Sequence, residues 1–289
     1  MMNATKELLN LVNSKTDKEE NFPVSSFLIS KKLQNHIKNF YIFARNADDI
    51  ADHPKFSINK KYKLLEELET LIRRKKKSEY FFVNNLLNTI KETGVNSNYP
   101  LNLLNAFKQD VEKKRYKNWQ DLIDYCDRSA SPVGRFVIDL HYLSNKNFDK
   151  NIESIYYGSD NLCNSLQILN HIQDCKKDFI SLDRVYIPEI YFNDFNFSTD
   201  QILKQEYRKN LLQVIDKCLL QVGDMLDKSK ENIIFINNNK RLKMETYVIF
   251  NIAKKLMSLL AKNDPIKKNV KLSRIDLIFC FFKGIIGKL

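Results

Sequence analysis

The sequence predicts an all-α protein, and three observations support this fold class. Apolar residues recur at intervals of three and four along most of the chain, which places them on one face of a helix. Only 6 glycines and 6 prolines occur among 289 residues, too few for the many tight turns of a β-sandwich or barrel. No segment alternates apolar and polar residues as a half-buried strand does. Because 43% of the chain is hydrophobic, residues 1–289 are interpreted as a single domain, a helical bundle with a central cavity.

In the first half of the chain, polar breaks separate four predicted helices. The first covers about residues 30–51 and ends at His53-Pro54, because proline disfavours helix in the residue before it. The next two cover about residues 58–77 and 80–93. Residues 96–100 are expected to form a break, after which a fourth helix begins at Leu101.

In the second half, a helix over residues 119–143 is expected to bend at Ser131-Pro132, where proline removes a backbone hydrogen bond. One continuous helix is predicted over residues 155–179, followed by a loop over residues 186–199 that is rich in Asn, Asp and aromatic residues. The last predicted helices cover about residues 200–228, 240–260 and 273–288.

The chain is basic, with a formal net charge of +12. Such a charge suits nucleic acid, an anionic membrane surface or a phosphorylated substrate. No zinc finger or RNP-like motif accompanies it, so a nucleic-acid partner is not expected. The densest basic run, residues 73–77, is interpreted as a solvated helix end, with a membrane-surface contact as the alternative. The absence of G-x-G-x-x-G and Walker patterns disfavours a nucleotide site of the usual kinds.

The cysteines and the chain terminus bear on the compartment. Five scattered cysteines without a C-x-x-C pair indicate free thiols in a reducing environment. No apolar stretch approaches the roughly 20 residues needed to cross a bilayer, and residues 1–20 lack the apolar core of a signal peptide. A cytoplasmic location is therefore expected, and peripheral membrane association is left open.

Two acidic clusters carry the strongest functional signal. Asp48 and Asp52 are spaced by four near the end of the first predicted helix, and Asn170, Asp174 and Asp178 repeat the same spacing in a later one. Residues at i and i+4 share a helix face. An isolated acidic pair is usually a solvated helix face, but two such groups in apolar helical sequence indicate a site for Mg²⁺ and a diphosphate, because Mg²⁺ prefers oxygen ligands and commonly binds substrate phosphates.

Four sequence blocks, which include both acidic clusters, carry a further signal. They are residues 20–24 (ENFPV), 43–52 (FARNADDIAD), 125–135 (YCDRSASPVGR), and 170–178 (NHIQDCKKD) followed by 182–188 (LDRVYIP). Together they resemble the squalene/phytoene synthases, all-α isoprenoid synthases that join or rearrange prenyl diphosphates. The resemblance runs from about residue 20 to the C-terminal helix. Within the family it is strongest to the branch of bacterial hydroxysqualene synthases of hopanoid biosynthesis.

The resemblance implies roles for particular residues. In the family, two acidic groups bind a Mg²⁺ cluster that grips the substrate diphosphate. The implied metal ligands here are Asp48, Asp49, Asp52, Asn170, Asp174 and Asp178. The implied catalytic residues are Asp48, Asp52, Asp174 and Asp178 with Tyr125, a pocket tyrosine. The implied substrate-binding residues are Tyr41, Arg45, Gln167, Asn170 and Arg128. Lys176, Lys177 and Arg184 are further candidate cations for the diphosphate.

Two departures from the family pattern favour one reaction. Many condensing members carry Ser-basic-Ser-Phe near the N-terminus, where this chain has residues 20–23 (ENFP), and the block from Asp127 to Pro132 is also changed. Both changes fit a Mg²⁺-dependent lyase that converts presqualene diphosphate and water to hydroxysqualene and diphosphate. The resemblance then implies an upstream presqualene diphosphate synthase and a downstream oxidoreductase as partners.

Two alternatives remain at this point. One is a head-to-head prenyltransferase that makes presqualene diphosphate, squalene or phytoene. The other is a non-catalytic assembly factor, which the intact aspartates disfavour because a scaffold has no need of carboxylates that repel one another.

Several residues near these motifs have simpler interpretations. Asp49 could act as a cap or salt-bridge partner beside the metal pair, and Arg128 could be structural. Asp110 is interpreted as a helix-surface carboxylate and His171 as a packed core or surface histidine.

Overall fold

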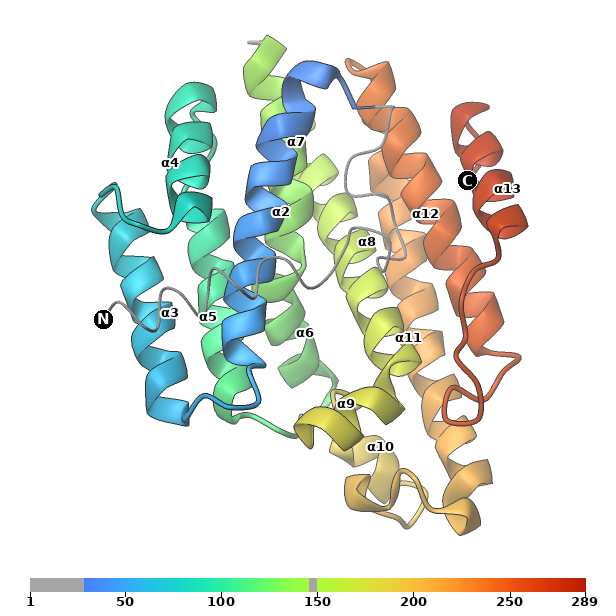
Figure 1. The fold of residues 1–289 in the computed structure, drawn as a ribbon. Helices are drawn as coiled ribbons and strands as arrows, with labels where there is room; N and C mark the ends of the chain where they lie inside the picture. The colour runs from blue at the N-terminus through green and yellow to red at the C-terminus, as the bar shows by residue number, and fades with distance from the viewer. Residues whose placement is uncertain (1–28, 146–149) are drawn as a thin grey trace. The chain divides into compact units, whose positions relative to one another are not determined.

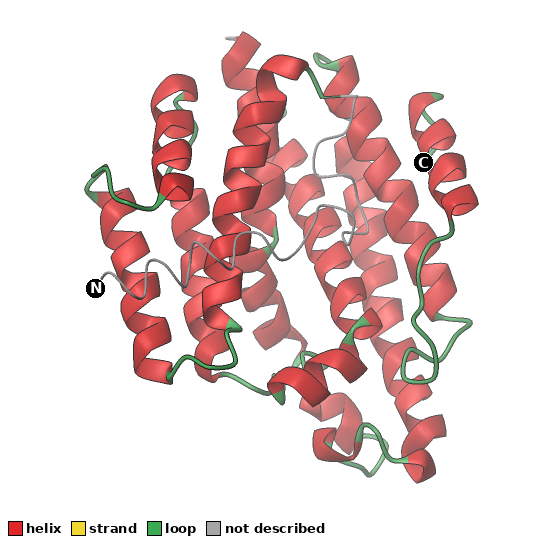
Figure 2. Ribbon diagram, in the orientation of Figure 1, coloured by secondary structure: helices red, strands yellow, loops and turns green. Residues whose placement is uncertain are grey.

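The computed structural model describes residues 29–145 and 150–289, and the residues that it describes are helical or loop (Figure 2). Strand-type pairing in this part of the chain is limited to one isolated bridge between Arg115 and Val185. The predicted all-α fold class is therefore confirmed. Within the same residues, no helix combines the length and apolar character needed to cross a membrane.

The described residues belong to two compact units. The first comprises the described part of Met1–Glu112 and Arg135–Lys150, and the second comprises Lys113–Gly134 and Asn151–Leu289. The functional residues predicted from the sequence are divided between these units, and each unit has its own buried apolar core.

The first unit is built around α2 (Lys31–Ala51), which packs against α3 (Ile58–Arg73), α4 (Phe81–Thr93) and α5 (Asn98–Glu112) (Figure 1). Its core-facing side chains recur at intervals of three and four, as the sequence predicts. On α2 they are Leu33, Ile37, Phe40, Phe43, Ala47 and Ile50. The buried apolar stripe fixes the orientation of α2 and thereby the positions of the acidic residues at its end.

The first unit also contains most of α7 (Ser131–Asn145). Phe136 of α7 stacks on Phe40 of α2, with ring centroids 4.0 Å apart and an angle of 14° between the ring planes. Stacked aromatic pairs add to the stability that comes from burial alone. This contact holds α7 against the same helix that carries the first acidic cluster.

The second unit begins with α6 (Trp119–Ser129) and is organised around α8 (Ile152–Gln173). Its remaining elements are α9 (Cys175–Leu182), α10 (Glu189–Asn193), η2 (Thr199–Gln201), η3 (Gln205–Tyr207), α11 (Arg208–Ile233), α12 (Lys240–Leu260) and α13 (Arg274–Ile285). The central helix α8 packs against α6, α11 and α12.

The helix predicted over residues 155–179 is not continuous, which corrects the sequence-based expectation. It is divided at Asp174, whose backbone (φ −95°, ψ 5°) leaves the helical region. Two side-chain contacts hold this junction to the loop after α12: Gln173 Nε2 donates to the Val270 carbonyl (2.6 Å) and Lys176 Nζ to that of Ile266 (3.1 Å).

Other differences concern helix boundaries. Helix α5 starts at Asn98, before the predicted Leu101, because Pro100 falls in the first turn, where backbone N–H groups lack helical partners anyway. The predicted loop over residues 186–199 contains the short helix α10. The helix predicted from residue 200 begins only at Arg208, after two 3₁₀ turns.

Two helical glycines in the second unit provide a test of its packing. A Cβ atom added at Gly158 of α8 would lie 2.8 Å from Asn232 Cβ and 3.0 Å from the Ile233 backbone nitrogen, whereas one added at Gly223 of α11 meets nothing within 4 Å. We expect Gly158→Ala to lower the free energy of unfolding by about 1–3 kcal/mol through overpacking. Gly223→Ala should raise it by up to about 1 kcal/mol, because alanine favours helix.

Urea unfolding followed by circular dichroism measures both effects. A Gly158→Ala variant at least as stable as wild type would contradict the close approach of α8 to the end of α11.

Candidate functional site

The first acidic group lies in the last turn of α2 and at its C-cap. Arg45 contacts two of its members, with Nη1 3.4 Å from Asp48 Oδ2 and Nη2 3.1 Å from Asp49 Oδ1. Asp52 is the C-cap residue, and its backbone N–H donates to the Asp48 carbonyl. Tyr41 lies one turn before Arg45 and is half-buried. These predicted site residues are therefore neighbours along one stretch of α2.

The environment of Asp48 opposes its ionisation. Burial by surrounding protein atoms and the neighbouring carboxylates of Asp52, Asp49 and Asp110 raise the pKa of Asp48 to about 8, against the lowering effect of Arg45. The side chain of Asp48 nevertheless keeps 34% of its surface exposed. Solvent therefore screens part of this effect, while burial and then the three neighbouring carboxylates set the upward direction of the pKa shift.

The position of these carboxylates is unfavourable for the helix as well. Backbone dipoles place partial negative charge at the C-terminal end of α2, where cations are stabilising, yet the last turn contains no basic residue. A group of mutually repelling carboxylates at this end is costly in the free protein. A bound divalent cation would remove that cost, so the donor set fits Mg²⁺.

Asp110 was interpreted from the sequence as a surface carboxylate, and this interpretation is wrong. The residue is 3% exposed on α5 and is one of the groups that raise the pKa of Asp48. It follows buried Leu103 by seven positions and buried Phe107 by three, so the helical spacing already placed it on the core-facing stripe. A carboxylate in an apolar position was the signal that could have identified it.

The second group of predicted residues surrounds the junction of α8 and α9. Gln167 and Asn170 lie in the last two turns of α8, Asp174 is the residue between the helices, and Asp178 lies in the first turn of α9. Despite the break, the backbone N–H of Asp174 donates to the Asn170 carbonyl (2.8 Å) and that of Asp178 to the Asp174 carbonyl (2.9 Å). The four-residue spacing of the predicted oxygen ligands is thus retained.

An aromatic cluster packs beside this junction. Tyr125 of α6 has ring centroids 5.5 Å from Tyr116 and 5.4 Å from Tyr186, and the ring of His171 stacks on Tyr186 at 3.4 Å. Tyr125 is only 3% exposed. The predicted site tyrosine is therefore fixed by packing from both sides.

The protonation state of His171 and two hydrogen bonds define the chemistry of the cluster. Burial and the nearby charge of Arg184 lower the pKa of His171 to about 3, so this imidazole is neutral at ordinary pH. Gln167 Nε2 lies 3.2 Å from His171 Nε2 and donates to it. The buried guanidinium of Arg184 donates from Nη1 to the Tyr186 hydroxyl (2.9 Å). The packed-histidine interpretation of His171 agrees with this environment.

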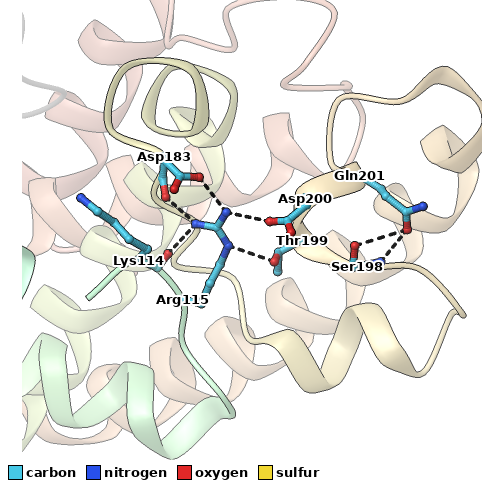
Figure 3. A network of polar contacts seen from close by, with 7 residues as sticks. All are labelled: Lys114, Arg115, Asp183, Ser198, Thr199, Asp200 and Gln201. Atoms are coloured by element: carbon cyan, nitrogen blue, oxygen red, sulfur yellow. Dashed lines mark hydrogen bonds and ion pairs between the residues drawn. The ribbon is translucent and has the colours of Figure 1, made fainter. Parts of the chain in front are cut away.

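Arg115 connects the segment before α6 to the segment after α9 (Figure 3). Its Nη2 donates to Asp183 Oδ1 and to Asp200 Oδ1, both at 2.8 Å, and its Nε donates to Thr199 Oγ1 at 3.0 Å. A backbone hydrogen bond links the same two segments, because the Val185 N–H donates to the Lys114 carbonyl (2.9 Å). These contacts hold the Asp183–Tyr186 segment in place, and no sequence motif indicated them.

The altered block after Tyr125 forms a polar network with α8. Asn164 Nδ2 donates to Asp127 Oδ1 (2.7 Å), and Ser131 Oγ donates to Asn164 Oδ1 (2.9 Å). Asn164 and Ser131 are both buried. The neighbouring Arg128 is half-buried and donates from Nε to the Asp124 carbonyl (3.0 Å), which is a contact within its own helix.

The structure brings the predicted residues together within each unit. Among the described residues, no three His, Cys, Asp or Glu side chains converge as a preformed metal cage. Mg²⁺ sites do not require one, because this ion keeps waters and takes oxygens from substrate phosphates. The residues present therefore fit a metal that is completed by a diphosphate.

The comparisons with known proteins agree with the fold. The chain belongs to the squalene/phytoene synthase family, whose sequence profile matches residues 15–276. It is 35% identical to a hydroxysqualene synthase of Zymomonas mobilis over 99% of this chain and 94% of that protein. It is 36% identical to one of Sinorhizobium fredii over 90% and 86%. A crystal structure of a dehydrosqualene synthase has the same fold, with a TM-score of 0.77 and 17% identity over 98% and 96% of the two chains.

The raised pKa of Asp48 predicts a pH dependence of stability. The folded protein binds more protons than the unfolded chain between pH 3.8 and about 8, so its stability should fall as pH rises through this interval. In metal-free buffer at about pH 8, we expect Asp48→Asn to be more stable than wild type by about 1–2 kcal/mol after solvent screening. The difference should shrink toward pH 4.

Urea unfolding at both pH values provides the measurement. Asp216→Asn on α11 serves as the control, because this exposed carboxylate lies outside the acidic group. A stability difference for Asp48→Asn that does not change with pH would contradict the repulsion at the end of α2.

Proposed function

We propose that the protein catalyses the Mg²⁺-dependent conversion of presqualene diphosphate and water to hydroxysqualene and diphosphate, as a carbon–oxygen lyase. The observation that supports this proposal best is the cluster of mutually repelling carboxylates at the end of α2. It occurs in a chain that is 34–36% identical to three hydroxysqualene synthases over at least 90% of its length.

The reaction breaks one bond and forms another. The C–O bond to the diphosphate breaks, the electron pair leaves with the diphosphate, and a carbocation remains on the prenyl carbon. After rearrangement of the carbon skeleton, water adds to the cation and loses a proton. No electrons are exchanged, so the proposed reaction needs no NADPH.

We assign metal binding to the two acidic groups. The ligands are Asp48, Asp49, Asp52, Asn170, Asp174 and Asp178. When bound, Mg²⁺ supplies charge neutralisation of the departing diphosphate. Arg45 donates charged hydrogen bonds to the diphosphate, and its contacts with Asp48 and Asp49 keep its guanidinium at the metal side of α2. We propose that residues 1–289 act as one functional domain.

The aromatic cluster suits a reaction that passes through a carbocation. The π face of a tyrosine ring attracts a cation. A stronger nucleophile would instead form a covalent bond with it. Tyr125 is held by Tyr116 and Tyr186, so its ring is fixed before the substrate arrives. Gln167, assigned from the sequence to the substrate wall, orients the neutral His171.

The Asp127–Asn164–Ser131 network is our candidate for positioning the water that ends the reaction. Its carboxylate and hydroxyl oxygens accept hydrogen bonds, and buried Asn164 holds both side chains. This network lies in the block where the sequence departs from the condensing members. The other departure, residues 20–23, lies outside the described residues.

The proposed substrate and product define the setting of the enzyme. An upstream presqualene diphosphate synthase must supply the substrate, and a downstream oxidoreductase must remove the hydroxyl group of the product. The reaction has no nucleic-acid partner, and we propose that it takes place in the cytoplasm, at or near a membrane that holds these lipids.

Product analysis tests the reaction against its alternatives. With Mg²⁺ and without NADPH, we expect the purified protein to convert presqualene diphosphate to hydroxysqualene and to consume little farnesyl diphosphate, because a lyase holds only one diphosphate. Mass spectrometry of extracted lipids identifies the products. Efficient formation of presqualene diphosphate from farnesyl diphosphate would identify a prenyltransferase instead, and inertness toward both would favour an assembly factor.

Substitution of one aspartate from each group tests the proposed site. Asp48→Asn and Asp174→Asn should each lower kcat by at least about a hundredfold, because each removes charge that holds the metal where the diphosphate departs. Asp216→Asn should leave kcat unchanged. Wild-type kcat in either aspartate variant, with an unchanged Mg²⁺ requirement, would remove that residue from the site.

Metal-directed cleavage tests whether each acidic group binds a metal. With Fe²⁺, ascorbate and peroxide in place of Mg²⁺, the wild-type backbone should be cut near residues 48–52 and near residues 170–178. Asp48→Asn should weaken the first cut, and Asp174→Asn should weaken the second. A cut that persists unchanged in the variant of its own group would remove that group from metal binding.

A further inference from the structure

The C-terminal helix α13 carries a large apolar face that the rest of the second unit leaves exposed. In Figure 1 this helix is drawn in red beside α12, against which it packs. Ile275 is 78% exposed, Phe282 60% and Phe279 59%. The complete face consists of Ile275, Ile278, Phe279, Phe282, Ile285 and the C-cap residue Ile286.

The exposed residues form one continuous surface, here called the α13 apolar face. At about 100° per residue, its six side chains fall within about 120° of the helix circumference. Isolated exposed apolar residues are common on protein surfaces, but a contiguous patch of this kind marks an interaction site.

The opposite side of α13 is tightly fixed to α12. Cys280 is 2% exposed, and a Cβ atom added at Gly284 would lie 2.5 Å from the Val248 backbone nitrogen. Ser273 and Asp276 form a capping box at the start of the helix. The α13 apolar face is thus presented by a rigidly held helix, and rotation of the helix cannot bury it.

Cations border the α13 apolar face. Arg274 and Lys283 lie at its two edges, and Lys271 and Lys288 lie just beyond the helix ends. The acidic residue of the helix, Asp276, is already paired, with Lys255 Nζ 2.8 Å from its Oδ1. An apolar stripe with positively charged edges complements a lipid surface, in which apolar acyl chains lie beneath negatively charged phosphate groups.

We propose that the α13 apolar face docks the protein onto the surface of a membrane that contains anionic lipids. With 12 residues, α13 is about 18 Å long, shorter than the roughly 30 Å hydrocarbon core, so it lies in the interface and does not span it. The phenylalanine and isoleucine side chains enter the acyl boundary, while Arg274 and Lys283 pair with phosphate groups.

A lipid surface fits this face better than a second copy of the chain. Two copies joined through the α13 apolar face would bring like-charged edges together, which is unfavourable. The face also offers no hydrogen-bonding side chain to specify a protein partner. The inference concerns binding alone and stands whether or not the proposed reaction is correct.

Vesicle flotation of the full-length protein tests the proposal. The vesicles contain phosphatidylcholine alone or phosphatidylcholine with one third phosphatidylglycerol. Wild type should float with the anionic vesicles, less at high salt, and only weakly with the neutral ones. The double variant Phe279→Ser/Phe282→Ser should lower the partition coefficient at least about tenfold, because burial of each ring in lipid is lost.

A matched control changes two exposed apolar residues of the same unit. Leu220 is 71% and Ile234 44% exposed at α11, and Leu220→Ser/Ile234→Ser should float as wild type does. Arg274→Glu/Lys283→Glu should reduce flotation with the anionic vesicles only. Circular dichroism and urea unfolding confirm that each variant is folded.

Three results would overturn the proposal. They are failure of the wild-type protein to float with anionic vesicles, equal loss of flotation in the two serine double variants, and unchanged flotation of Phe279→Ser/Phe282→Ser. Light scattering in the absence of lipid adds a fourth: conversion of a dimer to a monomer by Phe279→Ser/Phe282→Ser would assign the face to a second copy.

Discussion

Electrostatic repulsion at the end of α2 is the constraint on which the candidate site depends. The carboxylates of Asp49, Asp52 and Asp110 act on Asp48 where the helix dipole is also unfavourable to negative charge. Arg45 compensates only in part, since the pKa of Asp48 remains raised. The buried apolar stripe of α2 and its packing against α5 hold these groups in place. The core therefore keeps these carboxylates together despite their repulsion, and a cation of the kind proposed for this site would relieve it.

The second unit differs from the first, because its proposed oxygen ligands lie at a break between helices. Asp174 leaves the helical conformation, yet backbone hydrogen bonds on both sides preserve the four-residue spacing. Side chains from the same junction bind the loop after α12, and Arg115 fixes the segment that follows α9. In the first unit the positions of the proposed ligands follow from one helix. In the second they depend on contacts between segments far apart in the sequence.

This contrast explains how much the sequence could predict. Helical periodicity identified the all-α class, α2 and the spacing of Asp48 and Asp52, because these depend on interactions between near neighbours. The break at Asp174 and the role of Arg115 were missed because their partners are some 70 to 100 residues away. Asp110 was assigned to the surface although its spacing matched the buried stripe, since a carboxylate is seldom fully buried. The site residues follow from family motifs, whereas their supports are visible only in the structure.

The aromatic cluster complements the acidic groups in the proposed chemistry. A carbocation that must survive until water arrives cannot have a competent base beside it, because loss of a proton would end the reaction as an alkene. His171 has its pKa lowered to about 3, so it is a weak base, and Gln167 already occupies its Nε2 atom. Arg184, the nearby cation, is directed to the Tyr186 hydroxyl. The cluster therefore contains no strong proton acceptor among these contacts, which is compatible with the proposed capture of the cation by water over elimination.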